Sequence, residues 1–181
     1  MILTIFGGSA PKDGSKEYQQ AYDLGKLAAK QGWDIATGGY IGVMEAASRG
    51  AYDAGGHVIG VTCDEIEFFR PIGKNPWVTE ERKFETLRER LGHLVECCDA
   101  AIALPGGVGT LAEITMMWNM LIIKSIPPKK LVVIGSGWKK TISQFIKSTS
   151  GYIGEEDLHW LTFSPSIRAG WKEVITEKTN S

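Results

Sequence analysis

Short apolar runs alternate with stretches of helical periodicity along most of this chain, and this alternation limits the possible folds more than any other feature. The apolar runs are typical of strands buried on both faces and occupy residues 2–6, 33–36, 57–61, 100–104 and 131–134. The helical stretches lie between and after them, at residues 18–30, 42–54, 84–97, 111–124 and 141–147. Such an alternation predicts a parallel sheet with crossover helices on both of its faces.

The length and composition of the chain fit one such sheet. The 181 residues, 43% of them hydrophobic and 23% charged, are typical of a globular domain. We therefore predict an α/β fold, a Rossmann-like doubly wound parallel sheet, in a single domain over residues 1–181. Residues 160–163 could add an edge strand and residues 166–176 a closing helix. Residues 64–83 lack clear periodicity, which predicts a long loop that is either a lid or a pocket wall.

The charges, the cysteines and the lengths of the apolar runs limit the partners and the cellular location that we expect. The formal net charge of -1 comes from intermingled acidic and basic residues, so we expect no nucleic-acid polymer as a partner. Cys63, Cys97 and Cys98 are odd in number and contain no C-x-x-C pattern, which is typical of reduced thiols. The start of the chain lacks a basic segment, and no apolar run is long enough to span a bilayer. We expect a cytoplasmic protein that does not enter a membrane.

Glycines follow three of the predicted strands, at the points where those strands end. The segments read GGS at 7–9, TGGYIGVM at 37–44 and PGGVGTLAE at 105–113. The carboxyl ends of parallel strands meet at one edge of a sheet, so we expect the three segments to lie together. Glycine lets the backbone approach a ligand closely, and a helix that begins directly behind it presents unpaired N–H groups to an anion. The sequence therefore predicts a phosphate site formed by Gly106, Gly107, Gly109 and Thr110, closed on its other side by Gly38 and Gly39.

Other nucleotide motifs and metal sites do not fit these segments. Neither glycine cluster matches G-x-G-x-x-G or the P-loop pattern, and the missing lysine argues against ATP chemistry. No cluster of His, Cys and Asp has the spacing of metal ligands, so we expect neither a metal nor a cofactor. Glu113 could bring a carboxylate beside the phosphate. Its spacing from Thr110 fits a capping box equally well, which is a purely structural role.

Two of the predicted helices contain residues whose role can be interpreted in more than one way. Arg88 and Arg90 are two positions apart on a predicted helix, so only one of them can reach a common ligand, and either could instead be a solvated surface charge. The helix predicted at 111–124 is apolar nearly all round. It is either a central core helix or a helix packed between its own sheet and a second subunit, and we favour the homodimer.

The paired motifs G-G-x-x-G-V-M at 38–44 and P-G-G-x-G-T-x-x-E at 105–113 resemble the LONELY GUY (LOG) family, also labelled "lysine decarboxylase-like". The resemblance covers about residues 1–134 and implies a dimeric phosphoribohydrolase. Such an enzyme releases a free base from AMP or a cytokinin riboside 5'-monophosphate and leaves ribose 5-phosphate. The family pairs its motif glutamate with an arginine on the preceding helix, which implies catalytic roles for Glu113 and Arg90.

Two positions depart from the family pattern, since Leu91 stands where lysine is usual and Glu45 where glycine is usual. The run at 42–51 is more similar to a neighbouring branch that includes the molybdenum cofactor carrier proteins. The alternative is therefore a non-catalytic carrier of a nucleotide or a phosphorylated pterin, in which Glu113 only caps its helix. A decarboxylase is set aside, because no lysine that could form a Schiff base lies beside the glycine loops.

The hypothesis that follows places the ribose over Glu113 and the 5'-phosphate on the glycine loop. Cleavage of an N-glycosidic bond passes through an oxocarbenium-like state, which a carboxylate can stabilise while it orients or deprotonates water. Arg90 stays protonated and would hold the substrate and position Glu113. The remaining substrate contacts are predicted for Gly8, Ser9, Met44 and Glu45, and the segment Phe68-Phe69-Arg70 could also contact the base.

Overall fold

Seven parallel strands form one sheet in the computed structural model, which describes residues 1–149 and 151–176. Their order across the sheet is β4-β3-β2-β1-β5-β6-β7. The strands are β1 (Ile2–Phe6), β2 (Asp34–Thr37), β3 (Val58–Cys63), β4 (Glu80–Phe84), β5 (Ala100–Ala103), β6 (Lys130–Ile134) and β7 (Leu161–Ser164). The predicted α/β doubly wound fold is confirmed, including the edge strand expected at 160–163.

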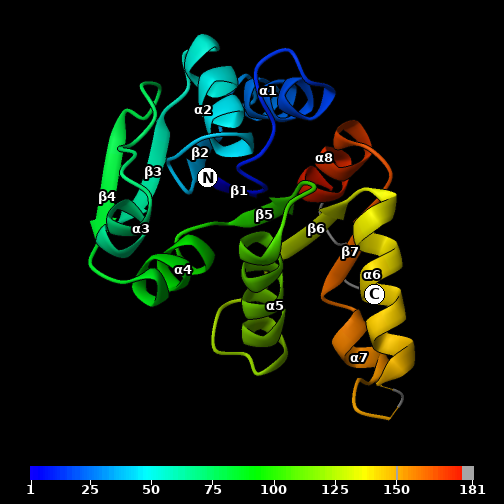
Figure 1. Ribbon diagram of the computed structural model, residues 1–181. Helices are drawn as coiled ribbons and strands as arrows, with labels where there is room; N and C mark the ends of the chain where they lie inside the picture. Colours follow the sequence, from blue (N-terminus) through cyan, green and yellow to red (C-terminus); the bar gives the residue numbers. More distant parts are fainter. Residues whose placement is uncertain (150, 177–181) are drawn as a thin grey trace.

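Helices cover both faces of this sheet (Figure 1). They are α1 (Lys16–Ala29), α2 (Val43–Asp53), α3 (Asp64–Phe69), α4 (Leu87–Glu96), α5 (Val108–Ile122), α6 (Ser136–Ser148), α7 (Glu155–Leu158) and α8 (Ile167–Ile175). One hydrophobic core lies between the sheet and α1, α2 and α8, and a second lies between the sheet and α4, α5 and α6. None of the described helices combines the length and the apolar character that a membrane crossing requires.

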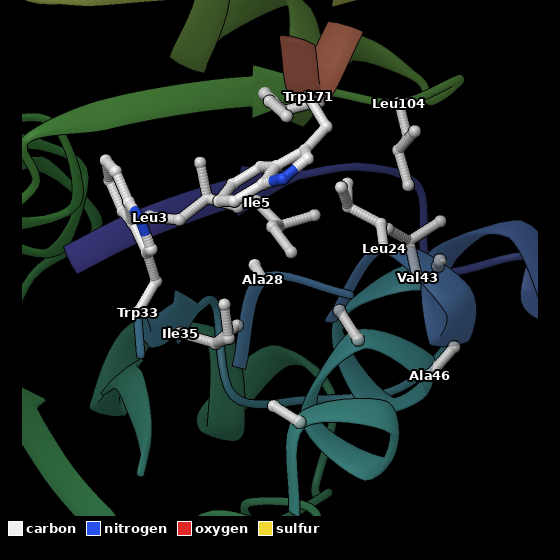
Figure 2. Close-up of a cluster of buried hydrophobic side chains, with 14 of the residues drawn as sticks. Leu3, Ile5, Leu24, Ala28, Trp33, Ile35, Val43, Ala46, Leu104 and Trp171 are labelled. Carbon is white, nitrogen blue, oxygen red and sulfur yellow. The ribbon is translucent and has the colours of Figure 1, made fainter. Parts of the chain in front are cut away.

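The two cores exist because the central strands are buried on both faces, as their unbroken apolar sequences predict. Figure 2 shows part of the first core, in which Leu3 and Ile5 of β1 belong to the same buried cluster as Leu24 of α1. Trp33 and Trp171 close this core with an edge-to-face contact of 5.5 Å between ring centroids. The sheet that positions the loops is therefore fixed by tight packing on each side.

Several boundaries differ from the predictions, each for a local reason. Residues 64–83 contain α3 and most of β4, so the prediction of a long loop is wrong. Strand β4 carries charged side chains at the edge of the sheet, where it is only partly buried, and so has no apolar run. Helix α4 begins three residues later than predicted, because Thr86 caps it in a capping box with Glu89. Helices α5 and α6 begin earlier, at Val108 and Ser136.

Candidate functional site

A cavity of about 330 Å³ opens at the carboxyl edge of the sheet, where the chain switches from the β1–β4 half to the β5–β7 half. Its walls come from the loops after β1, β2 and β5, from the helices α2, α3, α4 and α5, and from the segment that follows α3. The lining residues are Gly7, Gly8, Ser9, Tyr40, Met44, Ile66, Phe69, Arg70, Ile72, Arg90, Gly107, Val108, Gly109, Thr110 and Glu113. The predicted pocket wall at 64–83 is thus present, although it is partly helical.

A larger cavity of about 600 Å³ lies at the opposite, amino-terminal edge of the sheet. Trp33, Lys129, Lys130 and Trp160 are among its walls. Ligands of open parallel sheets bind at the carboxyl ends of the strands. The smaller cavity lies at the carboxyl ends of the strands, and it contains the buried charged side chains described next. For both reasons it is the candidate site.

The N-terminus of α5 forms one wall of the candidate site. Gly107 occupies the N-cap position and provides no side-chain hydrogen bond, so the first turn keeps its unpaired N–H groups. A Cβ atom added to Gly107 or Gly109 would meet no heavy atom within 4 Å, so the backbone faces open space there. Together with the positive end of the helix dipole, this geometry suits an anion.

Glu113 lies one turn further along α5 and is only 7% exposed. In the part of the chain that the structure describes, its carboxyl group forms no hydrogen bond or ion pair. Burial raises the pKa of Glu113 to about 7, and the positive charge of Arg90 opposes this rise. The capping-box alternative is wrong: α5 begins at Val108, so Thr110 lies inside the first turn and Glu113 in the second.

Arg90 is buried on α4, with 4% of its surface exposed, and lines the same cavity. Its Nε donates to the carbonyl oxygen of Val61 at 2.7 Å, and its Nη2 donates to the carbonyl oxygen of Gly38 at 3.2 Å. Arg88 is exposed. The expectation that only one of the two arginines reaches the site agrees with this arrangement, and the surface-charge alternative does not hold for Arg90.

Three of the predicted substrate contacts line the cavity: Gly8, Ser9 and Met44. Arg70, the residue directly after α3, approaches Ser9 with 3.5 Å between its Nη1 and the Ser9 Oγ. Glu45 does not line the cavity, and its Oε1 instead accepts a hydrogen bond of 2.8 Å from the hydroxyl of Tyr18. The position of Glu45 in the first turn of α2 explains this, since that face of the helix packs against α1.

Three of the glycines predicted to bind phosphate lie behind the cavity wall. The Cα of Gly38 packs against Arg90 and Met44, and Gly39 packs against Thr62 with a φ of +78°. Gly106 packs against Gly8 and Thr110. Of the predicted phosphate residues, the structure brings Gly107, Gly109 and Thr110 to the cavity.

Sequence reasoning missed Tyr40 and the apolar wall formed by Ile66 and Ile72. Tyr40 stands inside the glycine-rich segment 37–44, and a bulky aromatic residue among glycines could have marked it. Nothing in the irregular pattern of 64–83 points to Ile66 or Ile72. Across the described residues, no three His, Cys, Asp or Glu side chains gather closely enough to hold a metal ion.

This chain is similar in sequence to a known protein family and to several individual proteins. Residues 1–152 match the model of the SLOG cluster4 family. A protein of Oryza sativa subsp. japonica, the probable cytokinin riboside 5'-monophosphate phosphoribohydrolase LOGL3, is 36% identical over 91% of this chain and 78% of its own length. The phosphoribohydrolase LOG of the same organism is 32% identical over 92% of this chain and 69% of its own length.

Among solved structures, the molybdenum cofactor binding protein of Rippkaea orientalis has the same fold. It superimposes with a TM-score of 0.73 over 97% of both chains, at 24% sequence identity. This likeness concerns the arrangement of the sheet and its helices.

Proposed function

This chain belongs to the SLOG cluster4 family and is related to the LOG phosphoribohydrolases, and from that premise we propose that it is itself a phosphoribohydrolase. It cleaves the N-glycosidic bond of a nucleoside 5'-monophosphate, of the AMP or cytokinin riboside type, to a free base and ribose 5-phosphate. One observation carries the proposal: an unpaired, buried carboxyl group lies one turn behind the uncapped N-terminus of α5.

In this proposal the 5'-phosphate binds at the first turn of α5. The N–H groups of Gly107, Gly109 and Thr110 donate to its oxygens, and the helix dipole favours its negative charge. The ribose then extends toward Glu113, whose carboxyl group lies in the next turn of the same helix. The base occupies the apolar end of the cavity, between Met44 and Ile72.

Glu113 acts at the anomeric carbon. As the bond from C1' to the base breaks, its electrons pass to the base, and the carboxylate stabilises the positive charge that develops on the sugar. Water adds to C1' and gives a proton to Glu113. The departing base takes up one proton from solvent, and Glu113 returns its proton to solvent, so the protons balance over the reaction. A pKa of about 7 suits this role, because a general base works best near the operating pH.

Arg90 supports Glu113 without exchanging protons. The positive charge of its guanidinium lowers the pKa of Glu113, which favours the reactive carboxylate form. Two carbonyl oxygens already hold its Nε and Nη2. In the part of the chain that the structure describes, no hydrogen bond or ion pair engages its Nη1, which is available to the substrate.

The second candidate is a carrier of a nucleotide or a phosphorylated pterin. The fold shared with the molybdenum cofactor binding protein favours it, as do the departures at Leu91 and Glu45. A carrier would use the same phosphate site at α5 and leave Glu113 without a chemical role.

The assembly that we propose is a cytoplasmic homodimer built on α5. Val108, Leu111 and Ile123 expose 85%, 36% and 63% of their surfaces along and just beyond this helix, with the exposed polar residues Thr115 and Asn119 between Leu111 and Ile123, and in the proposed dimer the second copy covers these side chains. The three free cysteines agree with a reducing compartment. Light scattering at micromolar concentration should give twice the mass of the chain, and a monomer mass would contradict the dimer.

The experiment that tests the activity is to incubate the purified protein with AMP and with a cytokinin riboside 5'-monophosphate. Chromatography should detect the free base and ribose 5-phosphate in equal amounts. Glu113→Gln should slow their release at least about a hundredfold, the usual loss on removing one acid-base or electrostatic group.

The control is Glu173→Gln, which removes an exposed carboxylate on α8 and should leave the rate unchanged. If the wild-type protein binds these nucleotides but releases no base, the phosphoribohydrolase is excluded and the carrier takes its place.

A further inference from the structure

Tyr40 is firmly anchored in the loop between β2 and α2. Its side chain is 3% exposed and lines the candidate site. Its hydroxyl accepts a hydrogen bond of 2.8 Å from the N–H of Cys63 and donates one of 3.1 Å to the carbonyl oxygen of the same residue. These two bonds fasten the ring to the end of β3, so the ring keeps one orientation.

That ring is the surface against which Arg90 lies. The Cζ of Arg90 is 5.6 Å from the centroid of the Tyr40 ring, within the range of a cation–π contact. Carbonyl oxygens hold two of the guanidinium nitrogens at Val61 and Gly38. Across the described residues no carboxylate forms an ion pair with Arg90, so the aromatic face is an important electrostatic neighbour of this buried cation.

We propose that Tyr40 is a positioning residue for Arg90: its anchored ring keeps the guanidinium against the carbonyls of Val61 and Gly38, so that the charge faces Glu113. This inference rests on the proposed function of Arg90 and Glu113. It assigns Tyr40 a contribution to the reaction that passes through Arg90.

The hydroxyl of Tyr40 serves as an anchor and does not take part in proton transfer. Burial raises the pKa of Tyr40 to about 12, so the hydroxyl stays protonated at any working pH and both bonds to Cys63 persist. The other charged group near this hydroxyl is Glu67 of α3, with its Oε1 at 3.5 Å. Lys83 of β4 pairs with the second oxygen of Glu67 at 2.7 Å, which holds that carboxylate toward β4.

Two substitutions distinguish the contribution of the Tyr40 ring from the contribution of the hydroxyl that anchors it. Tyr40→Leu removes the ring, so Arg90 loses its support, and kcat should fall about ten- to hundredfold, as expected when a reacting group is misplaced. KM should change less than kcat, because the phosphate site on α5 is intact. Tyr40→Phe keeps the ring and loses only the anchor, and should restore most of kcat.

The dependence of the rate on pH tests whether Tyr40 acts on the reaction through Arg90. A purely structural role for Tyr40 would leave this pH profile unchanged. Arg90 lowers the pKa of Glu113, so a guanidinium that moves away from Glu113 should shift the acidic limb of the rate profile to higher pH. The matched control is Tyr18→Leu with Tyr18→Phe. Tyr18 is equally buried, with 3% exposed, but its hydroxyl bonds Glu45 outside the cavity. Tyr18 variants should lose stability without moving the limb.

A double-mutant cycle decides whether Tyr40 acts through Arg90. Once Arg90→Ala has removed the guanidinium, Tyr40→Leu should cause little further loss of kcat. Losses that multiply would overturn the inference.

A direct titration of Glu113 keeps the inference testable even without turnover. Carbon NMR of the labelled carboxyl group should show a higher midpoint in Tyr40→Leu than in the wild type. An unchanged midpoint overturns the inference whether or not the protein releases base. If Tyr40→Leu does not fold, Tyr40→Phe should still give a smaller shift in the same direction, and its absence is equally decisive.

Discussion

The two glycine-rich loops at the carboxyl edge of the sheet have similar sequence patterns but different structural roles. In the loop between β5 and α5, Gly107 faces open space and the helix behind it begins without a side-chain cap. In the loop between β2 and α2, Gly38 is packed against Arg90 and Met44, and Gly42 against Ser9. The first loop is open to a ligand, whereas the second is closed.

The difference teaches that glycine can serve either the ligand or the protein's own packing. A closed loop can still contribute to a site, because the carbonyl oxygen of Gly38 holds Arg90. The loop after β1 connects the two: Gly8 donates from its N–H to Pro105 at 3.1 Å and accepts from Val43 at 2.9 Å. We therefore expect the open loop to determine binding and the closed loop to determine the position of the charge.

Gly107→Val should have the largest effect, because its side chain would occupy the space assigned to the phosphate. Losing two charge-assisted hydrogen bonds costs at least about 3 kcal/mol, which weakens binding more than about a hundredfold. Titration calorimetry with ribose 5-phosphate measures this loss. The melting temperature should barely change, since the added atoms meet open space. Unchanged affinity would mean that the open loop does not bind the phosphate.

The buried carboxyl group behind the open loop should make stability depend on pH. The pKa of Glu113 rises from 4.5 to about 7 on folding. Below about pH 4.5 the group is protonated in both states and has no effect. As the pH rises toward 7, the unfolded chain releases its proton first, so the folded wild type loses stability.

Glu113→Gln cannot lose this proton, so its stability relative to the wild type should grow with pH. The gain should approach about 3 kcal/mol above pH 8, because a tenfold difference in proton affinity between the folded and unfolded states corresponds to about 1.4 kcal/mol. Chemical denaturation at pH 4.5 and pH 8 measures the difference. A constant difference across this range would show that burial does not raise the pKa of Glu113.

Gly38→Ala should have the smallest effect, and it should change kcat rather than the affinity for the phosphate. The added methyl group would displace the Nη2 of Arg90 and approach the Sδ of Met44, at a cost of about 1–3 kcal/mol in stability. We expect kcat to fall about tenfold through the displaced arginine, while ribose 5-phosphate binds as before. If affinity falls with kcat, the closed loop contacts the phosphate after all.

Much of the fold could be predicted because burial leaves a direct pattern in the sequence. Strands β1, β5 and β6 are covered on both faces and so appear as unbroken apolar runs. Strand β4 is half-exposed at the edge, and its sequence EERKF carries no such pattern. The early starts of α5 and α6 also escaped prediction, since both begin behind glycine without a capping side chain.

The site could be predicted only in part, because glycine patterns do not reveal which way a loop faces. Gly107 and Gly38 belong to similar motifs, and only their packing distinguishes them. Arg90 and Glu113 were identified through the family resemblance, since their spacing alone fitted surface or capping roles. The contact between Tyr40 and Arg90 joins residues that are far apart in the chain, and it depends on the sheet that brings them together.

The most direct test of the open loop as the phosphate site is a crystal structure of Glu113→Gln with AMP, a variant in which the nucleotide should stay uncleaved. We predict that the phosphate lies within hydrogen-bond distance of the N–H groups of Gly107 and Thr110, with C1' of the ribose facing residue 113. A phosphate held by Gly38 and Gly39, with the ribose away from residue 113, would contradict this assignment.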